Sequence, residues 1–230
     1  MSSDTFFYQV GQRIGGETLI DWTRRYGFGT ETGIELAHEE DPGHVPDDKW
    51  KRSYTGSGWF IGDTINMSID QGFMLATPLQ VANMFAVPAN GGDLVKPHLR
   101  LGDEEARQWR KSLNLKPETM AALQDGLRQV VTQGTGPVLN VASLPPAAGK
   151  SGTAEDPPRE SHVWFGGYAP LDDPEIIVVA FGENLGGGGG SVAGPMVKAV
   201  LETYFKKDQP QESDDGDKEA VEAEPVALRP

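Results

Sequence analysis

The stretch PPAAGKSGTAE, residues 145–155, places a lysine, two small hydroxyl side chains and a glycine directly after a proline-rich turn. Its Gly-Lys-Ser also ends the phosphate-binding P-loop motif, which requires a glycine five residues before Gly149. This chain has Leu144 there, so the loop lacks the turn that aims backbone N–H groups at a phosphate. We therefore interpret residues 149–153 as part of an extended strand.

A strand displays alternate side chains on opposite faces, so Lys150 and Gly152 would share one face and Ser151 and Thr153 the other. Glycine lets the backbone of a ligand approach closely. A cationic lysine, hydroxyl groups and exposed strand N–H groups together suit a peptide carboxylate and a developing oxyanion. Four residues are equally compatible with an ordinary lysine beside a turn, so both interpretations stay open at this point.

The segments that follow this stretch predict a sheet. SHVWFGGYAP (161–170) and EIIVVAFGEN (175–184) are strand-like runs joined by a Pro-Leu-Asp-Asp-Pro turn, which is typical of a β-hairpin. We interpret GGGGGS (186–191) as a flexible connector. A terminal helix with one apolar face is expected to start at 194–195.

Helices are predicted before this sheet. Residues 5–26 have helical spacing of apolar residues, interrupted at Gly15-Gly16, whereas residues 27–63 show no sustained period and are expected to be irregular. A capped helix should begin after Thr77, and Pro88 should end its regular part; another helix should cover 117–131. The predicted strands are short and antiparallel, and the helices must cover them. We therefore expect an α+β fold with an antiparallel sheet flanked by helices.

Composition limits the possible partners. The chain has 230 residues, no cysteine and a net charge of −14, which argues against nucleic acid or an anionic membrane surface as the main partner. No apolar run approaches the roughly 18 residues of a membrane span, and no signal peptide is visible. Residues 208–230 carry eight acids against Lys218 and Arg229. We expect a folded domain over 1–207 and an acidic, disordered tail over 208–230.

Two common kinds of catalytic site are not indicated. His38 and His44 lie six residues apart in HEEDPGH, whereas a helical zinc site needs two histidines four apart. There is also no G-x-S-x-G motif for a hydrolase nucleophile. We therefore expect no metal and no cofactor.

Four longer stretches resemble a known family. They are MSSDTFFYQVG (1–11), YGFGTETGIEL (26–36), GDTINMSIDQGFMLATPLQVANMFAVPANGGDLVKPHL (62–99) and GKSGTAE (149–155). Together they resemble the penicillin-binding transpeptidases and serine β-lactamases, whose signature is S-x-x-K, then S-x-N or S-D-N, then K-[ST]-G. The similarity is strongest to the elongation-type class B penicillin-binding proteins, in which the second motif is commonly Ser-x-Asp, and it extends from Ser2 to about Phe205.

The resemblance implies a β-lactamase/transpeptidase-like fold and a D,D-transpeptidase that cross-links peptidoglycan in cell-wall elongation and cell-shape maintenance. It implies that Lys150 organises the proton network and holds the donor peptide, while Ser151, Gly152 and Thr153 bind the substrate or a β-lactam carboxylate. Ser2 would relay the proton to the leaving amine and Asp4 would fix the local network. Ser3-Asp4-Thr5 is an alternative alignment with S-D-N; we prefer Ser2-Ser3-Asp4.

The chain departs from the family in two respects. No serine is followed by lysine three residues later, so the nucleophile of S-x-x-K is missing from this sequence. We therefore expect the C-terminal part of the enzyme, incomplete at the N-terminus of the domain and inactive alone, with two strands, the membrane anchor and a pedestal domain upstream. A non-catalytic module that binds peptidoglycan or a partner enzyme is the alternative. Asp70 also replaces a glycine that is usual in SIDQG.

The partners implied by the resemblance are peptidoglycan stem peptides, β-lactam antibiotics and, for the full-length parent, the cell-wall elongation machinery. No nucleic acid is expected, and contact with the membrane would be made only through the N-terminal anchor. The implied location of the parent is the extracytoplasmic face of the bacterial inner membrane.

Overall fold

The computed structural model describes residues 3–36 and 38–206. The elements, in chain order, are α1 (Asp4–Ile14), α2 (Gly16–Arg25), α3 (Asp48–Thr55), α4 (Ile61–Met67), α5 (Pro78–Asn90), β1 (Asp93–Val95), α6 (Glu104–Gln108), β2 (Arg110–Ser112), α7 (Pro117–Gln133), the 3₁₀ helix η1 (Pro137–Leu139), β3 (Ala148–Asp156), β4 (Arg159–Ala169), β5 (Ile176–Gly182) and α8 (Gly189–Lys206).

The main sheet contains three antiparallel strands in the order β3-β4-β5. Lys150 lies opposite Gly166, and Gly166 lies opposite Val179 on the next strand. This confirms the predicted strand at Lys150 and its pairing with the hairpin. Among the residues that the structure describes, no further strand pairs with the outer edge of β3 or of β5.

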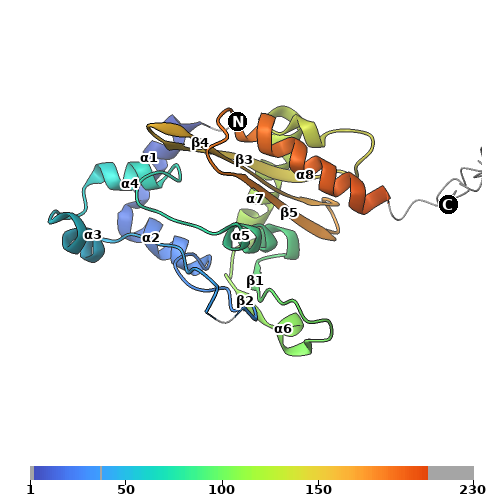
Figure 1. The fold of residues 1–230 in the computed structure, drawn as a ribbon, viewed down its shortest axis with the longest axis horizontal. Helices are drawn as coiled ribbons and strands as arrows, with labels where there is room; N and C mark the ends of the chain where they lie inside the picture. Colours follow the sequence, from blue (N-terminus) through green and yellow to red (C-terminus); the bar gives the residue numbers. More distant parts are fainter. Residues whose placement is uncertain (1–2, 37, 207–230) are drawn as a thin grey trace, which may run out of the picture.

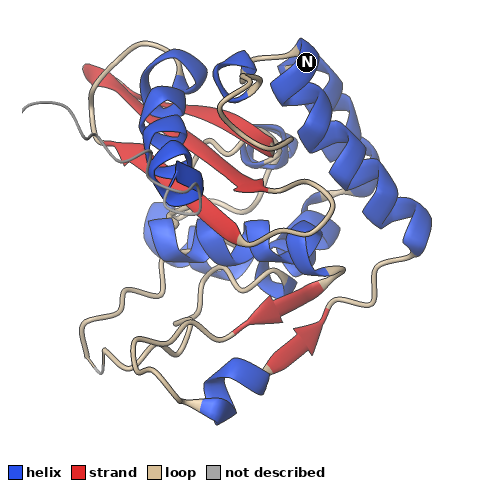
Figure 2. Ribbon diagram, turned by 90° about the vertical axis from the view of Figure 1, so that its right-hand side faces the viewer, coloured by secondary structure: helices blue, strands red, loops and turns tan. Residues whose placement is uncertain are grey.

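Helices cover both faces of this sheet (Figures 1 and 2). On one face α8, η1 and α7 pack against Phe165 of β4 in a cluster that includes Val131, Leu139 and Val197. On the other face α5 contributes Phe85, which packs with Ala148 and Tyr168. The α+β fold with an antiparallel sheet flanked by helices is therefore confirmed.

The N-terminal helices form a second cluster beside this sheet. Ile20 of α2, Met67 of α4 and the loop residues Phe28 and Val45 make up its buried part. The expected helical segment over 5–26 is confirmed, including the interruption: Gly15 has φ of 79° between α1 and α2. A small antiparallel sheet of β1 and β2 projects with α6 from the lower side of the molecule in Figure 1.

The expectation of irregular structure over residues 27–63 is wrong in part, because α3 lies inside this range and α4 begins there. Asp47 starts α3 by accepting a hydrogen bond from the N–H of Trp50 at 2.8 Å. A helix of eight residues is too short to show a convincing apolar period, so only its cap residue signals it in the sequence.

Pro88 does not end α5, contrary to expectation, since the helix continues to Asn90. The proline lacks the N–H that would bond one turn back, but the N–H of Gly91 closes the helix on Val87 O. Pro88 itself is buried, and Gln124 of α7 donates to its carbonyl at 2.8 Å. Packing against α7 therefore stabilises the helical conformation after the proline. The predicted cap is confirmed: Thr77 and Gln80 form a reciprocal capping box.

The glycine run is the third difference. The helix α8 starts at Gly189 and not at 194–195, so the last glycines belong to the helix and the run is not a simple connector. A Cβ at Gly189 would lie 2.2 Å from Gly152 O and 2.3 Å from Trp164 O. Gly189 is thus needed for the close approach of α8 to β3 and β4.

The predicted acidic tail, 208–230, lies outside the described residues, as does Ser2. Within the described ranges, none of the helices combines the length and the apolar character needed to cross a membrane.

Candidate active site

The predicted site strand is β3, whose nine residues include Lys150, Ser151, Gly152 and Thr153. Directly paired residues of an antiparallel sheet point to the same face, so their neighbours identify the two faces. Lys150 pairs with Gly166, against which Phe85 of α5 packs closely. Ser151 pairs with Phe165, which packs under α8. Lys150 therefore lies on the α5 side and the two hydroxyl residues lie on the α8 side, as the alternation predicts.

Lys150 is half-buried, and its Nζ donates to the backbone oxygen of Ser151 at 2.5 Å. Burial lowers the pKa of the amine below its ordinary value, while the negative charges of Asp70 and Asp4 act to raise it. The fold has thus brought two carboxylates from distant parts of the chain into electrostatic contact with this lysine. One of them, Asp4, is a predicted site residue at the start of α1.

Asp70 is the residue that the sequence marked only as a departure from the family. Its φ of 61° lies in the left-handed region, which explains why glycine is usual at this turn. Asp70 lines a hollow together with the apolar side chains of Trp22, Met74 and Met84. Confinement there raises the pKa of the Asp70 carboxyl, and the charge of Lys150 partly opposes that rise.

The hydroxyl groups of the strand are held by two neighbours that the sequence did not indicate. Ser151 Oγ lies 2.6 Å from Thr135 Oγ1, in the loop after α7. The N–H of Gly189, at the start of α8, donates to Thr153 Oγ1 at 3.2 Å. Both partners reach the strand only through tertiary packing, and no local motif marks them.

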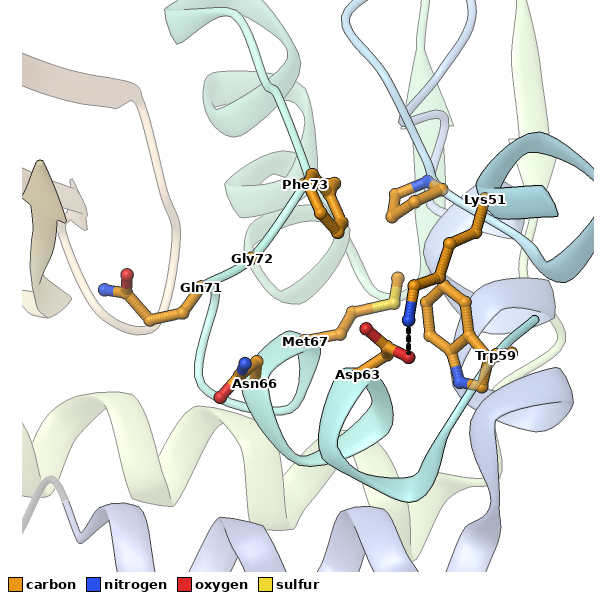
Figure 3. Close-up of a pocket in the computed structure, with 9 residues that line it drawn as sticks. Lys51, Trp59, Asp63, Asn66, Met67, Gln71, Gly72 and Phe73 are labelled. Carbon is orange, nitrogen blue, oxygen red and sulfur yellow. Dashed lines mark hydrogen bonds and ion pairs between the residues drawn. The ribbon is translucent and has the colours of Figure 1, made fainter. Parts of the chain in front are cut away.

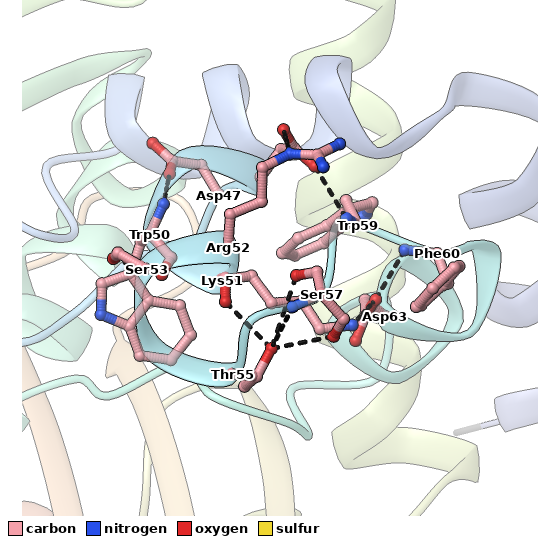
Figure 4. Close-up of polar contacts among 11 residues, drawn as sticks. Asp47, Trp50, Lys51, Arg52, Ser53, Thr55, Ser57, Trp59, Phe60 and Asp63 are labelled. Atoms are coloured by element: carbon pink, nitrogen blue, oxygen red, sulfur yellow. Dashed lines mark hydrogen bonds and ion pairs between the residues drawn. The ribbon is translucent and has the colours of Figure 1, made fainter.

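A separate cavity of about 290 Å³ lies between α3, α4 and the loop that carries Phe73 (Figure 3). Its wall contains an ion pair in which Lys51 Nζ lies 2.5 Å from Asp63 Oδ2. Asp63 also accepts a hydrogen bond from the N–H of Phe60 (Figure 4), and the Lys51 ammonium lies 4.7 Å from the centre of the Phe60 ring. No residue of the K-S-G-T strand lines this cavity, so we regard the ion pair as structural.

Metal ligands do not gather at either place. In the part of the chain that the structure describes, no group of three or more His, Asp or Glu side chains is placed to hold a metal ion.

Comparison with known proteins assigns the fold. Residues 1–202 match the family model described as the penicillin binding protein transpeptidase domain. The chain belongs to this family. A peptidoglycan D,D-transpeptidase MrdA of Haemophilus influenzae is 35% identical over 91% of the chain and 36% of its own length. That of Escherichia coli K12 is 30% identical over 87% of the chain and 35% of its own length.

Solved structures agree with this transpeptidase assignment. Pseudomonas aeruginosa PBP2 in complex with WCK 5153 has a TM-score of 0.77 and 33% identity, over 87% of this chain and 46% of that one. PBP2 of Helicobacter pylori in a complex with MreC also has a TM-score of 0.77, with 31% identity over 89% of this chain and 38% of that one. This chain therefore spans about a third of the length of the MrdA relatives that it matches.

Proposed function

We propose that this chain is the C-terminal part of a serine-type D,D-transpeptidase that cross-links peptidoglycan during cell-wall elongation and cell-shape maintenance. The observation that carries the proposal is the position of Lys150. It lies on an edge strand beside two hydroxyl groups and under the influence of Asp4 and Asp70, in a chain of the transpeptidase family. The names of the MrdA relatives support the same activity.

In this proposal the donor stem peptide lies along the free outer edge of β3, where strand N–H and C=O groups can pair with an extended ligand. Ser151 and Thr153 hydrogen-bond the terminal carboxylate, or that of a β-lactam. Gly152 leaves room for the ligand backbone, and the N–H of Thr153 supplies one oxyanion donor. Lys150 attracts the carboxylate and organises proton transfer, Asp4 fixes that network, and Ser2 relays the proton to the leaving amine.

We further propose that the 230-residue chain alone forms no acyl adduct. A hydroxyl group becomes a good nucleophile only beside an activating base, and no serine in this sequence has the S-x-x-K partner. The pair Ser151–Lys150 is a poor substitute, because the two side chains lie on opposite faces of β3.

Mass spectrometry after incubation with a labelled penicillin tests this point. We expect the unmodified mass at all incubation times. A one-to-one adduct mapped to Ser2 or Ser151 would contradict the proposed inactivity and require a different mechanism.

Ligand recognition can be measured without turnover. Titration with a peptide ending in D-Ala-D-Ala should shift the backbone amide NMR signals of residues 150–153. Thr153→Val, which removes a hydroxyl but keeps the shape, should weaken binding by about tenfold. Thr203→Val in α8, where the hydroxyl bonds Ala199 O, is the matched control and should leave binding unchanged. Shifts confined to other parts of the chain would refute the assignment of the site.

The partners and location of the whole protein follow by similarity only. The H. pylori structure is a complex of PBP2 with MreC, and the P. aeruginosa structure is a complex with WCK 5153. We propose that the protein containing this chain binds β-lactams and works with the cell-wall elongation machinery. Its place of action would be the extracytoplasmic face of the inner membrane, where peptidoglycan is assembled.

A further inference from the structure

The loop that joins β5 to α8, residues 183–188, is tied to the β3–β4 hairpin. The side chain of Asn184 donates to Glu160 O at 2.7 Å and to Asp156 Oδ2 at 3.0 Å. The N–H of Gly186 donates to Ser161 O at 3.0 Å. At the end of the loop the N–H of Gly189 reaches Thr153 Oγ1, a hydroxyl of the K-S-G-T strand. The loop is therefore connected by hydrogen bonds both to the β3–β4 hairpin and to a hydroxyl group of the candidate site.

The fit between this loop and the sheet is close. A Cβ at Gly186, where φ is 68°, would lie 2.6 Å from Glu160 Oε2, and one at Gly189 would lie 2.2 Å from Gly152 O. Side chains at these two positions would therefore push the segment away from β3 and β4. Asn184 and Gly189 therefore anchor the two ends of one closely packed segment.

His162 of β4 adds a further restraint on the backbone of Asn184. Its Nδ1 lies 3.1 Å from the backbone N of Asn184, which donates to it, so Nδ1 carries no proton in this arrangement. The proton of the neutral ring is then on Nε2, which faces Asp156 Oδ2 at 3.4 Å. Asn184 has φ of 49°, so the N–H is presented by a backbone conformation that few residues other than glycine adopt.

The surroundings of His162 contain few other charges. Asp156 of β3 faces the ring, and Arg159 of β4 binds the same carboxylate at 2.7 Å. Glu160 of β4 reaches toward Gly186. From β5 the neighbour is the uncharged ring of Phe181, with ring centres 5.6 Å apart. Protonation of Nδ1 would make it a donor that faces the N–H donor of Asn184, so this hydrogen bond would be lost. Nε2 would keep its contact with Asp156.

We propose that His162 is a positioning residue: in its neutral form it holds residues 183–189 against the K-S-G-T strand and so orients Thr153, and its protonation releases the loop. The consequence for ligand binding rests on the proposed function of Thr153, whereas the release of the loop does not.

Amide hydrogen exchange of the 230-residue chain, corrected for intrinsic rates, tests the positioning role between about pH 5 and pH 8, where imidazole titrates. In the unaltered chain the protection of residues 184–189 should fall by about tenfold toward pH 5. His162→Asn places an acceptor oxygen near the position of Nδ1 but does not titrate, so it should keep the protection at both pH values. His162→Gln reaches instead toward the Nε2 side and should lose the protection at both.

Three outcomes would overturn the proposal. One is full protection of residues 184–189 in His162→Gln at pH 8. The second is an unchanged pH dependence in His162→Asn, which would place the titrating group elsewhere. The third is loss of the pH dependence in the control His98→Asn, whose histidine lies before α6 and away from this loop. The two variants are both polar and similar in size, so they should perturb the packing to a similar extent. A general loss of folding in either variant would be recognised from faster exchange throughout the sheet.

The link to function has its own measurement. Binding of the D-Ala-D-Ala peptide to the unaltered chain should weaken toward pH 5, and His162→Asn should abolish that weakening. If no peptide binds at any pH, the proposed function fails and the exchange result stands. If peptide binds with the same affinity in all variants while the loop is released, the orientation of Thr153 by His162 is refuted.

Discussion

The side chains of Lys51 and Asp63 are only 8% and 16% exposed, and Lys51 Nζ lies 2.5 Å from Asp63 Oδ2. Loss of one partner of such a pair leaves an uncompensated buried charge, which is far more costly than the loss of an exposed pair. Asp63 also accepts the N–H of Phe60 at the start of α4. The two roles can be separated, because asparagine retains the acceptor oxygen and loses the charge.

Asp63→Asn should therefore destabilise the chain by about 3 kcal/mol, measured by urea unfolding. The matched control is Arg107→Ala, which breaks the exposed Arg107–Glu104 pair in α6, and it should cost about 0.5 kcal/mol or less. Equal effects of the two substitutions would show that the Lys51 ammonium is well hydrated and that its burial has no energetic consequence.

At the scale of elements, the contact of α5 with the sheet depends on Gly166. A Cβ at this position would lie 2.1 Å from Phe85 Cε2, so a side chain there requires separation of the Phe85 ring from the sheet. Lys150 pairs with this glycine across β3 and β4, so the separation would also disturb the site strand.

Gly166→Ala should cost about 1–3 kcal/mol through overpacking. Gly126 in α7 is the opposite case, since nothing lies within 4 Å of an added Cβ. Gly126→Ala should stabilise the chain by about 0.5–1 kcal/mol, because alanine loses less conformational freedom in a helix. Both changes are measured by urea unfolding; stabilisation by Gly166→Ala would mean that α5 is loosely packed on the sheet.

At the scale of the whole molecule, Glu35 joins two segments that are far apart in the chain. The N–H of Leu99 donates to Glu35 Oε2 at 2.8 Å, and Arg100 lies beside the same carboxylate. These interactions lower the pKa of Glu35 from an ordinary value of 4.5 to about 2. Because the folded pKa is depressed, the contribution to stability is present above about pH 4.5 and is lost as the pH falls toward 2.

Glu35→Gln should remove this part of the acid dependence. The difference in unfolding midpoint between the unaltered chain and the variant should be largest at pH 6 and shrink toward pH 2.5. Asp47 and Asp156 also have lowered pKa values, so the unaltered chain loses further stability in acid that the variant shares. Glu118→Gln at the exposed first turn of α7 is the control. A constant difference at every pH would mean that Glu35 acts through packing and not through its charge.

Local sequence signals determined much of the fold. The Thr77–Gln80 capping box, the hairpin turn of 170–174 and the alternation along β3 involve residues within a few positions of one another, so their patterns can be read directly. The strand position of Lys150 was predicted in this way and is confirmed. The roles of the site residues stay predictions, since they come from the resemblance to the transpeptidase family.

The tertiary structure decided everything that depends on segments distant in the chain. It placed Asp4 and Asp70 in the field of Lys150, brought Gly189 onto Thr153, and continued α5 through Pro88 by packing against α7. No local pattern contains these facts, because each depends on how closely two elements approach after folding. Gly189 illustrates the reason: the sequence shows only that a side chain is absent, whereas the structure shows that a Cβ there would collide with the backbone of β3 and β4.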